Sequence, residues 1–322
     1  MATRRDVAKK AKVSEATVSY VLNNTKPLTP EVRQRVLKAV EELNYRPNLV
    51  ARSLASNHTR HVALLVENLQ NPYFMEVLEG AQQVANEKGY IISTLTTAGA
   101  DIESMARLIG HGVEGAILTV LDGTVERYVQ RHLRCVLNGE AVKIDYGPAV
   151  YEMVDKLVEL GHESVAFLAG IPLAPGHARY EHLAAALAAR GLALDERLVV
   201  PCTREKRTDE AAGYEATRTL LARKLPFTAL FAVNDLMAIG AIRALAENGL
   251  SVPGDVSVIG CDNIPLGRWL TPSLSTIHVT ANAMGRHLME ALIDLIEKNR
   301  KKEPVLPSKF ICRETVAERK RQ

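Results

Sequence analysis

The chain has 322 residues, 47% of them hydrophobic and 24% charged, which is enough for a small domain and two hydrophobic cores of ordinary size. Its charge is uneven, because residues 1–60 carry 12 Lys and Arg against 5 Asp and Glu, whereas the remainder carries 28 against 32. No stretch approaches membrane-spanning length, and the basic start is followed by an amphipathic pattern, so we expect neither a membrane span nor a secretion signal.

Residues 4–23 predict two short helices joined by a tight turn. Thr3 can cap the first helix together with Asp6, three residues later, and Ser14 can cap the second. Apolar side chains recur at helical spacing, which predicts an inner face of Val7, Ala8, Ala11, Thr17, Val18 and Val21. The outer face of the second helix is then Glu15, Ala16, Ser19 and Tyr20.

A third helix is expected next, because two such short helices cannot bury a core alone. Thr29 is placed to cap it, and Pro30 takes its first position. The inner stripe of this helix is Val32, Val36, Leu37, Val40 and Leu43. The three helices predict a helix-turn-helix domain, and the excess of basic residues favours binding to DNA phosphates. Any other small helical bundle is the alternative interpretation.

Several longer runs resemble one protein family. The run DVAKKAKVSEATVSYVLNN at 6–24 and the run YRPNLVARSLAS at 45–56 resemble the DNA-binding head and hinge of the lactose repressor (LacI/GalR) family of bacterial transcription regulators. Lys12 departs from the glycine that this family usually has in the turn, and we expect it to adopt a positive φ there. The resemblance covers nearly the whole chain in family order, through NPYF at 71–74, ELGHESVAFLAG at 159–170, AVNDLMAIGAIRAL at 232–245 and VPGDVSVIGCDNIPLGRWLTPSLSTI at 252–277.

Residues 47–60 are predicted to form a hinge and linker. Pro47 ends the preceding helix and Asn48 can cap a short new one, which has no core of its own and should be disordered alone. The resemblance implies a hinge helix that folds on DNA beside its two-fold mate and inserts Leu54 into the minor groove, with Asn48 and Arg52 near the backbone or the groove floor. The alternative is a plain linker whose leucine packs on the body.

The operator contacts are expected on the second helix and the hinge. We hypothesise that Glu15, Ala16 and Tyr20 face base edges in the major groove, while hydroxyl side chains and nearby lysines hold phosphates. Paired hinges predict a near-palindromic double-stranded operator. The full expected DNA-binding set is Ser14, Glu15, Ala16, Thr17, Ser19, Tyr20, Asn23, Asn48, Arg52 and Leu54.

From residue 61 onward, short apolar runs alternate with helical stretches, which predicts parallel sheets with helices between the strands. The expected fold class is therefore α/β, with the helix-turn-helix head and hinge helix followed by two Rossmann-like subdomains of the periplasmic-binding-protein type. The resemblance implies three crossings between the subdomains, near 145–147, 277–279 and 304. The clearest expected helices are 73–88, 149–160, 179–189 and 235–248. The expected domains are 1–46, 47–60, 61–146 with 278–303, and 147–277 with 304–322.

A ligand cleft is expected between the subdomains, because ligands of open α/β sheets bind outside the carboxyl ends of the strands. An arginine and an aspartate facing an aromatic ring can bond adjacent sugar hydroxyls while the ring packs on the pyranose. Asn234 could instead simply cap the helix that follows, as could Asp235, and Arg179 could make a structural salt bridge. The expected ligand-binding set is Asn68, which follows the first strand, with Phe74, Arg179, Asn234 and Asp262, which match family ligand positions.

Two apparent motifs carry no chemistry in this interpretation. Gly110, Gly112 and Gly115 spell GxGxxG, but they follow a helix and precede a strand, the reverse of the order in nucleotide sites, so we interpret them as a turn. His177 and His182 have no Asp, Glu or Cys at metal-ligand spacing. Solvated or packed histidines are the expected outcome.

No catalytic signature is present, since the chain contains no GxSxG, GxxxxGK[ST] or HExxH. We therefore expect no enzyme, no cofactor and no bound metal. A reducing cytoplasm is expected from cysteines that are far apart and form no CxxC pair, namely Cys135, Cys202, Cys261 and Cys312.

Departures from the family pattern limit the ligand prediction. Asn138, Gly139 and Glu140 stand where the family usually has a longer loop with an aspartate, and His182 stands where glycine is common. These changes could reshape the pocket or remove effector binding. A carbohydrate is the first expectation, and a nucleobase or a phosphorylated metabolite is the second.

Two function classes are compatible with such a cleft: an operator-binding repressor controlled by a small molecule, and a periplasmic-type sugar-binding protein. The basic head, the hinge and the missing secretion signal favour the repressor. The C-terminal run FICRETVAERKRQ lacks leucine heptads, so we expect a homodimer and not a tetramer.

Overall fold

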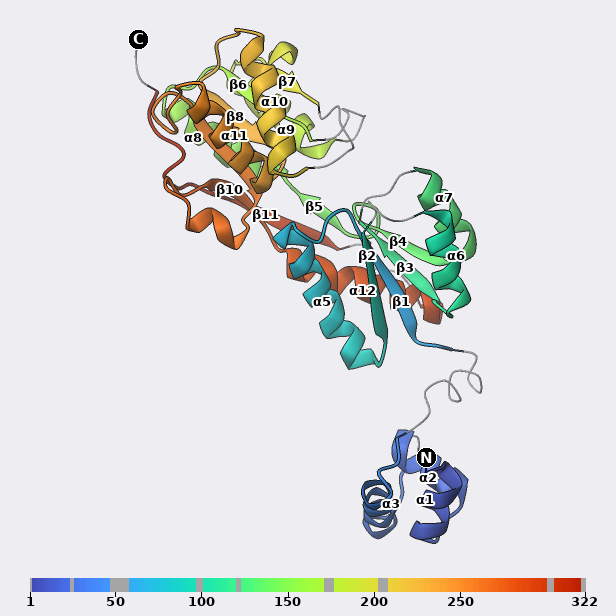
Figure 1. Cartoon of the computed structure of the whole chain (residues 1–322). Coiled ribbons are helices and arrows are strands. Elements are labelled where there is room, and N and C mark those ends of the chain that lie inside the picture. The colour runs from blue at the N-terminus through green and yellow to red at the C-terminus, as the bar shows by residue number, and fades with distance from the viewer. Residues whose placement is uncertain are drawn as a thin grey trace. The chain divides into compact units, whose positions relative to one another are not determined.

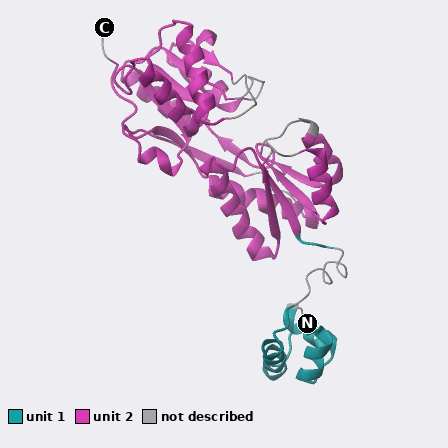
Figure 2. Ribbon diagram, in the orientation of Figure 1, with its two compact units in different colours: residues 1–60 teal, residues 61–322 magenta. Residues whose placement is uncertain are grey.

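The computed structural model describes residues 2–23, 26–46, 58–96, 101–119, 123–170, 177–201, 208–299 and 304–319. The chain divides into two compact units, residues 1–60 and 61–322 (Figure 1, Figure 2). The hinge residues Asn48, Arg52 and Leu54, and also Cys202, lie outside the described residues. Within the described ranges, none of the helices is long and apolar enough to cross a membrane.

The described part of the first unit contains three helices: α1 (Arg4–Ala11), α2 (Glu15–Asn23) and α3 (Pro30–Glu42). The expected capping box is confirmed, because the Thr3 hydroxyl accepts the amide hydrogen of Asp6 and the Asp6 carboxylate accepts that of Thr3. Ser14 caps α2 as predicted, since its hydroxyl accepts the amide hydrogen of Thr17 at 3.1 Å. Lys12 ends α1 with the expected positive φ, 53°.

The three helices pack around a small apolar core. Two expectations for α3, the inward position of Leu37 and the cap at Thr29, were wrong. Leu37 is 45% exposed and Ala39 takes an inner position, because the helical repeat places residue 39 on the side of Val36 and turns residue 37 away from it. Thr29 precedes α3, but its side chain makes no capping hydrogen bond. The buried core residues are Val7, Ala8, Ala11, Val18, Val21, Val36 and Ala39.

The first half of the second unit is a four-stranded parallel sheet in the order β2-β1-β3-β4. Helices α5 (Pro72–Lys88) and α12 (Ala281–Glu297) pack on one face, and α6 (Ile102–Gly110) and α7 (Gly123–His132) pack on the other. The glycines of the GxGxxG run form the turn between α6 and β3, as interpreted from the sequence. The strands are β1 (His61–Val66), β2 (Ile91–Thr96), β3 (Gly115–Leu118) and β4 (Arg134–Leu137).

The second half is built on a seven-stranded sheet in the order β5-β11-β10-β9-β8-β6-β7, parallel except where β10 meets β11. Its strands are β5 (Lys143–Asp145), β6 (Val165–Leu168), β7 (Val199–Val200), β8 (Ala229–Ala232), β9 (Ser257–Asp262), β10 (Ser275–Val279) and β11 (Val305–Ile311). One face carries α8 (Gly147–Glu159) and α9 (Ala178–Ala188), and the other carries α10 (Glu210–Ala222) and α11 (Asp235–Glu247).

Three neighbouring segments join the two halves. β10 belongs to the second sheet and leads directly into α12, which packs against α5 of the first half. β11 then lies antiparallel to β10, and β5 lies parallel to β11. The connections therefore lie side by side and are hydrogen-bonded to one another (Figure 1).

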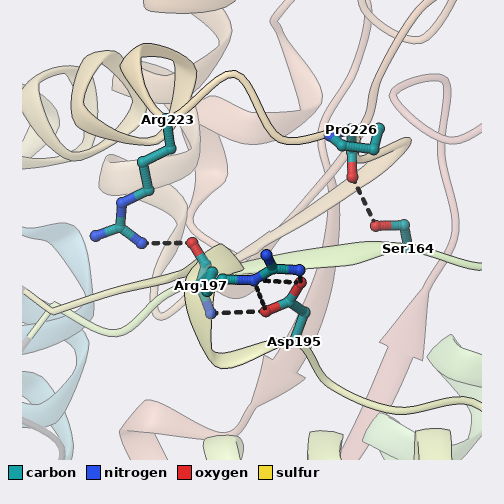
Figure 3. Close-up of polar contacts among 5 residues, drawn as sticks. All are labelled: Ser164, Asp195, Arg197, Arg223 and Pro226. Atoms are coloured by element: carbon teal, nitrogen blue, oxygen red, sulfur yellow. Dashed lines mark hydrogen bonds and ion pairs between the residues drawn. The ribbon is translucent and has the colours of Figure 1, made fainter.

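Polar contacts fasten the short edge strand β7 (Figure 3). The Arg197 guanidinium binds the Asp195 carboxylate, with 2.7 Å between Nη2 and Oδ2, in the turn η2 (Glu196–Leu198) that leads into β7. Arg223, at the end of α10, donates to the carbonyl oxygens of Arg197 and Val199 at 2.5 and 3.0 Å. The two Arg223 bonds therefore tie β7 and the turn before it to α10. Close by in Figure 3, Ser164, the residue before β6, donates to the carbonyl oxygen of Pro226, in the segment before β8, at 2.9 Å.

One helix pair in each half approaches closely at reciprocal glycines. A Cβ added to Gly80 of α5 would clash with the backbone of Asn282 in α12, and one added to Gly285 of α12 would clash with the backbone of Val77 in α5. In the second half, Gly213 of α10 and Gly240 of α11 meet in the same way. Glycine is needed here for its lack of a side chain and not for its backbone freedom.

Gly80→Ala is expected to destabilise the protein by about 2 to 3 kcal/mol, because overpacking against backbone cannot be relieved by a change of rotamer. Gly110→Ala is the matched control, since it lies at the end of a helix with no atom within 4 Å of an added Cβ. The control should change stability by less than about 1 kcal/mol. Thermal and denaturant unfolding of both variants test this, and equal stability of the two would contradict the close helix contact.

Candidate functional site

The outward face of α2 carries the residues predicted to contact bases. Glu15 and Ala16 are exposed, and Ser19 and Tyr20 are half-buried. The Lys26 ammonium lies 4.6 Å from the centroid of the Tyr20 ring, which places a positive charge beside this aromatic side chain. The face is therefore polar, aromatic at one position and flanked by cationic charge.

The first turn of α2 carries the hydroxyls predicted to contact phosphates. The hydroxyl oxygens of Ser14 and Thr17 lie 2.9 Å apart, and Ser14 is engaged in capping the helix. Amide hydrogens at a helix start favour an anion, so this end of α2 suits a DNA phosphate. Asn23 is the last residue of α2, and its side chain lies outside the described part of the chain.

In the second unit, a cavity of about 550 Å³ is lined by residues of both halves. Most of its walls follow the carboxyl ends of strands, where the sequence placed the cleft. Four of the five predicted ligand residues line it: Phe74, Arg179, Asn234 and Asp262. Asn68 does not line the cavity, and its side-chain oxygen accepts the amide hydrogen of Gln70 at 2.8 Å in a local turn.

Arg179 is the central cation of the cavity. It lies in the first turn of α9, its Nη2 donates to the hydroxyl of Tyr146 at 2.8 Å, and its Cζ lies 4.5 Å from the centroid of the Tyr146 ring. Burial lowers the pKa of Arg179, but Tyr146, Cys261 and Asp262 together raise it further, so the guanidinium stays charged. Its buried Nε has no hydrogen-bond partner among the described residues. The arginine is thus oriented by Tyr146 and retains a donor for an acceptor atom.

Asp262 ends β9 beside this cation, with a φ of 111°. Burial raises the pKa of Asp262 well above its ordinary range, although the charge of Arg179 and a hydrogen bond with Asn71 lower it. The neighbouring Cys261 is fully buried, and burial raises the pKa of its thiol to about 12 while Arg179 lowers it. The wall beside Arg179 therefore holds few groups that ionise readily at neutral pH.

Asn234 and Asp235 have different roles. Asn234 lines the cavity and also caps α11, since its side-chain oxygen accepts the amide hydrogen of Met237 at 2.9 Å. Asp235 is fully buried and was wrongly considered as a cap, because its carboxylate accepts from the Thr276 hydroxyl at 2.6 Å and from the Ile264 amide at 2.8 Å. Burial raises the pKa of Asp235 to about 7, and those two hydrogen bonds lower it. Asp235 therefore fastens the loop after β9.

Several cavity residues were missed by the sequence reasoning. Tyr146 directly follows β5 and Tyr73 precedes the predicted Phe74, with the Tyr73 and Phe74 rings edge to face at 5.3 Å. Glu67 directly follows β1, and Thr208 precedes α10. Position immediately after a strand is the signal that could have found Glu67 and Tyr146.

The predicted packing of His177 is found, because this histidine is buried and caps α9 with Nδ1 accepting the Tyr180 amide hydrogen at 3.3 Å. Its Nε2 lies 3.2 Å from the carbonyl oxygen of Ala169. Across the described residues, no group of three or more His, Cys, Asp or Glu side chains is placed to hold a metal ion. The cavity combines a charged donor, a carboxyl group, amides and aromatic rings, which suits reversible binding of a small polar molecule.

Comparison with known proteins identifies both units. Residues 3–48 match the family model described as bacterial regulatory proteins, lacI family, and residues 154–316 match the periplasmic binding protein-like domain. The chain is 32% identical over 327 residues to the HTH-type transcriptional repressor PurR of Pasteurella multocida, covering 95% of each protein.

Solved structures agree with this match. The lac repressor bound to ONPG in its repressed state has a TM-score of 0.77 and 26% identity, covering 98% of this chain and 99% of that one. The regulator CelR in complex with cellobiose has a TM-score of 0.70 and 28% identity, covering 98% of this chain and 100% of that one.

The family and fold expected from the sequence are confirmed. The chain therefore belongs to the LacI family of bacterial transcriptional regulators, and it is a DNA-binding repressor with an effector-binding domain and not an enzyme.

Proposed function

We propose that this repressor binds a near-palindromic operator as a homodimer in the cytoplasm, and that a small molecule held in the cavity between the two halves controls it. The observation that carries the effector site is Arg179, a buried cation that Tyr146 orients and whose Nε has no partner among the described residues. A carbohydrate is the first candidate, since this cation, Asp262 and the Phe74 ring supply the polar and apolar contacts that a pyranose needs. The likeness to the CelR–cellobiose complex adds support.

A nucleobase is the second candidate. Three aromatic side chains, Tyr73, Phe74 and Tyr146, line the cavity, and aromatic walls suit a planar heterocycle. A thermal-shift screen of the full chain against sugars, phosphosugars and nucleobases separates the candidates, because a ligand that binds only the folded state raises the melting temperature. A rise in melting temperature with nucleobases alone would show that the effector is a nucleobase and not a carbohydrate.

The proposed subdomains are 61–146 with 278–303 and 147–277 with 304–322. The packing of α12 against α5 and the pairing of β11 with β10 support these boundaries. In the same proposal, the head ends at residue 46 and residues 47–60 form the hinge, with Leu54 as the minor-groove wedge and Asn48 and Arg52 beside the DNA backbone. The hinge assignment rests on the sequence resemblance.

The DNA contacts are tested at Tyr20. Replacing Tyr20 by alanine is expected to cost about 1 to 3 kcal/mol of binding to an operator selected from random DNA, and little on non-specific DNA. Fluorescence anisotropy at fixed salt measures both affinities. Because Tyr20 is half-buried, the melting temperature of the variant is measured alongside. Equal losses on both DNAs would reassign Tyr20 to backbone contact or to the core of the head.

The effector site is tested with Arg179→Ala and Asp262→Asn. Asparagine is chosen for residue 262 because alanine rarely adopts a φ of 111°. Both variants should keep operator affinity without effector and lose the response to the compound found in the screen, since coupling vanishes when a ligand no longer distinguishes the states. Arg190→Ala, which removes a surface ion pair with Asp155, is the control and should respond normally. A normal response in both site variants would remove this cavity as the effector site.

Homodimerisation is supported by an exposed apolar patch on the second unit. Trp269 is 83% exposed, and Leu266, in the short turn η3 (Pro265–Arg268) before it, is 47% exposed. Met75 on α5 is also exposed, at 46%. Exposed aromatic and aliphatic side chains gathered in this way are typical of a subunit interface.

Trp269→Glu is expected to weaken the dimer by at least about 2 kcal/mol, the usual loss for a buried interface tryptophan. Sedimentation velocity over a range of concentrations measures the dissociation. Ile102→Glu, at another exposed apolar position on α6, is the control and should dimerise like the parent. A dimer unaffected by Trp269→Glu would place the interface elsewhere.

A further inference from the structure

Glu67 reaches across the cavity from the first half to the second. Its carboxylate accepts the amide hydrogen of Thr208 at 3.2 Å, and the Thr208 hydroxyl lies 3.5 Å from each of its oxygens. Both residues are half-buried and line the cavity. A charged acceptor in a partly water-excluded place makes a stronger hydrogen bond than a neutral one.

Thr208 is held in place by contacts within the second half. Its carbonyl oxygen accepts a hydrogen bond from Asn234 Nδ2 at 2.8 Å, and Asn234 in turn caps α11. The next residue, Asp209, caps α10 by accepting the amide hydrogen of Ala212 at 2.9 Å. A Cβ added to Gly170 would lie 2.9 Å from Thr208 Cγ2, so the side chain is also closely packed. Thr208 therefore moves with the second half, and its bond to Glu67 resists separation of the halves.

Asn71 lines the cavity on the same side as Glu67. It caps α5 in the first half, where its side-chain oxygen accepts the amide hydrogen of Tyr73 at 3.0 Å. Asp262 of the second half lines the same cavity, and the Asn71 side chain lowers its pKa, which burial raises. The hydrogen bond between Glu67 and Thr208 therefore joins the halves at a cavity wall to which both contribute.

We propose that Glu67 is a latch residue that sets how far the two halves close around the cavity. The latch is a property of the chain itself, and only its regulatory meaning rests on the proposed effector site. A small molecule that donates a hydrogen bond to Glu67 competes with Thr208 for the carboxylate and therefore favours the more open form. The closure of the cleft, and through it the position of the heads, then depends on a single carboxylate.

Hydrogen–deuterium exchange on the full chain, with no small molecule added, tests the latch. In Glu67→Ala, the amides of residues 67–74, 177–183 and 208–213 should exchange about 10-fold faster, the factor expected for loss of one charge-assisted hydrogen bond. Residues 177–183 are included because this segment, at the start of α9, begins with the cavity-lining residues 177–179 and belongs to neither partner segment. Exchange in β9 and α12 should match the parent, and Glu67→Gln, which keeps an acceptor oxygen, should fall between the two.

Glu103→Ala is the control, because Glu103 is a glutamate of the same half that pairs with Arg107 at the surface, and its exchange at the three segments should equal the parent's. Unchanged exchange in Glu67→Ala overturns the latch. Faster exchange confined to residues 208–213 also overturns the latch, because Glu67 then only orders that segment. Faster exchange that spreads through β9 and α12 overturns it as well, because Glu67 then stabilises the fold as a whole. Faster exchange at all three segments, with no binding in the screen, leaves the latch standing and removes the effector site.

Discussion

The backbone hydrogen bonds among β5, β11 and β10 constrain everything else in the second unit. These segments carry the chain between the halves, and each is hydrogen-bonded to the next, which holds the three connections together. Residues at the strand ends of both sheets line the same cavity. Tyr146 directly follows β5, which places the residue that orients Arg179 beside the segments that join the two halves.

In the proposed effector site, ligand recognition is coupled to domain movement by short physical links. Arg179 is hydrogen-bonded to Tyr146, which directly follows the joining strand β5, and Asp262 and Asn71 line the cavity from its two halves. A molecule that touches the arginine or the aspartate therefore touches a group whose position depends on closure. Such direct contact is a simpler basis for allostery than a long chain of intermediates.

Much of the fold could be predicted because its signals are local. The capping pairs Thr3 with Asp6 and Ser14 with Thr17 involve residues three apart, and apolar periodicity marks the buried faces of helices and strands. Arg179 and Asp262 could be nominated from family position and from their places near strand ends. The prediction failed at Leu37 because this residue was assigned to the inner stripe by its hydrophobicity, although the helical repeat turns it away from Val36 and places Ala39 inward.

The missed residues depend on partners far along the chain. Tyr146 is 33 residues from Arg179, and Glu67 is 141 residues from Thr208, so neither contact leaves a pattern in the neighbouring sequence. Asp235 is similar, since a carboxylate at a helix start usually suggests a cap, and only the tertiary fold brings Ile264 and Thr276 to it.

The burial of Cys261 gives the protein its own chemical reporter. A thiol with a pKa of about 12 and no exposed surface is almost entirely in the unreactive protonated form, whereas Cys312 is exposed. Cys261 belongs to the hydrophobic core on one face of the second sheet, one residue before Asp262 of the cavity. Its protection from alkylation therefore reports the integrity of this core in the natural sequence, and Cys312 supplies an exposed thiol for comparison in the same chain.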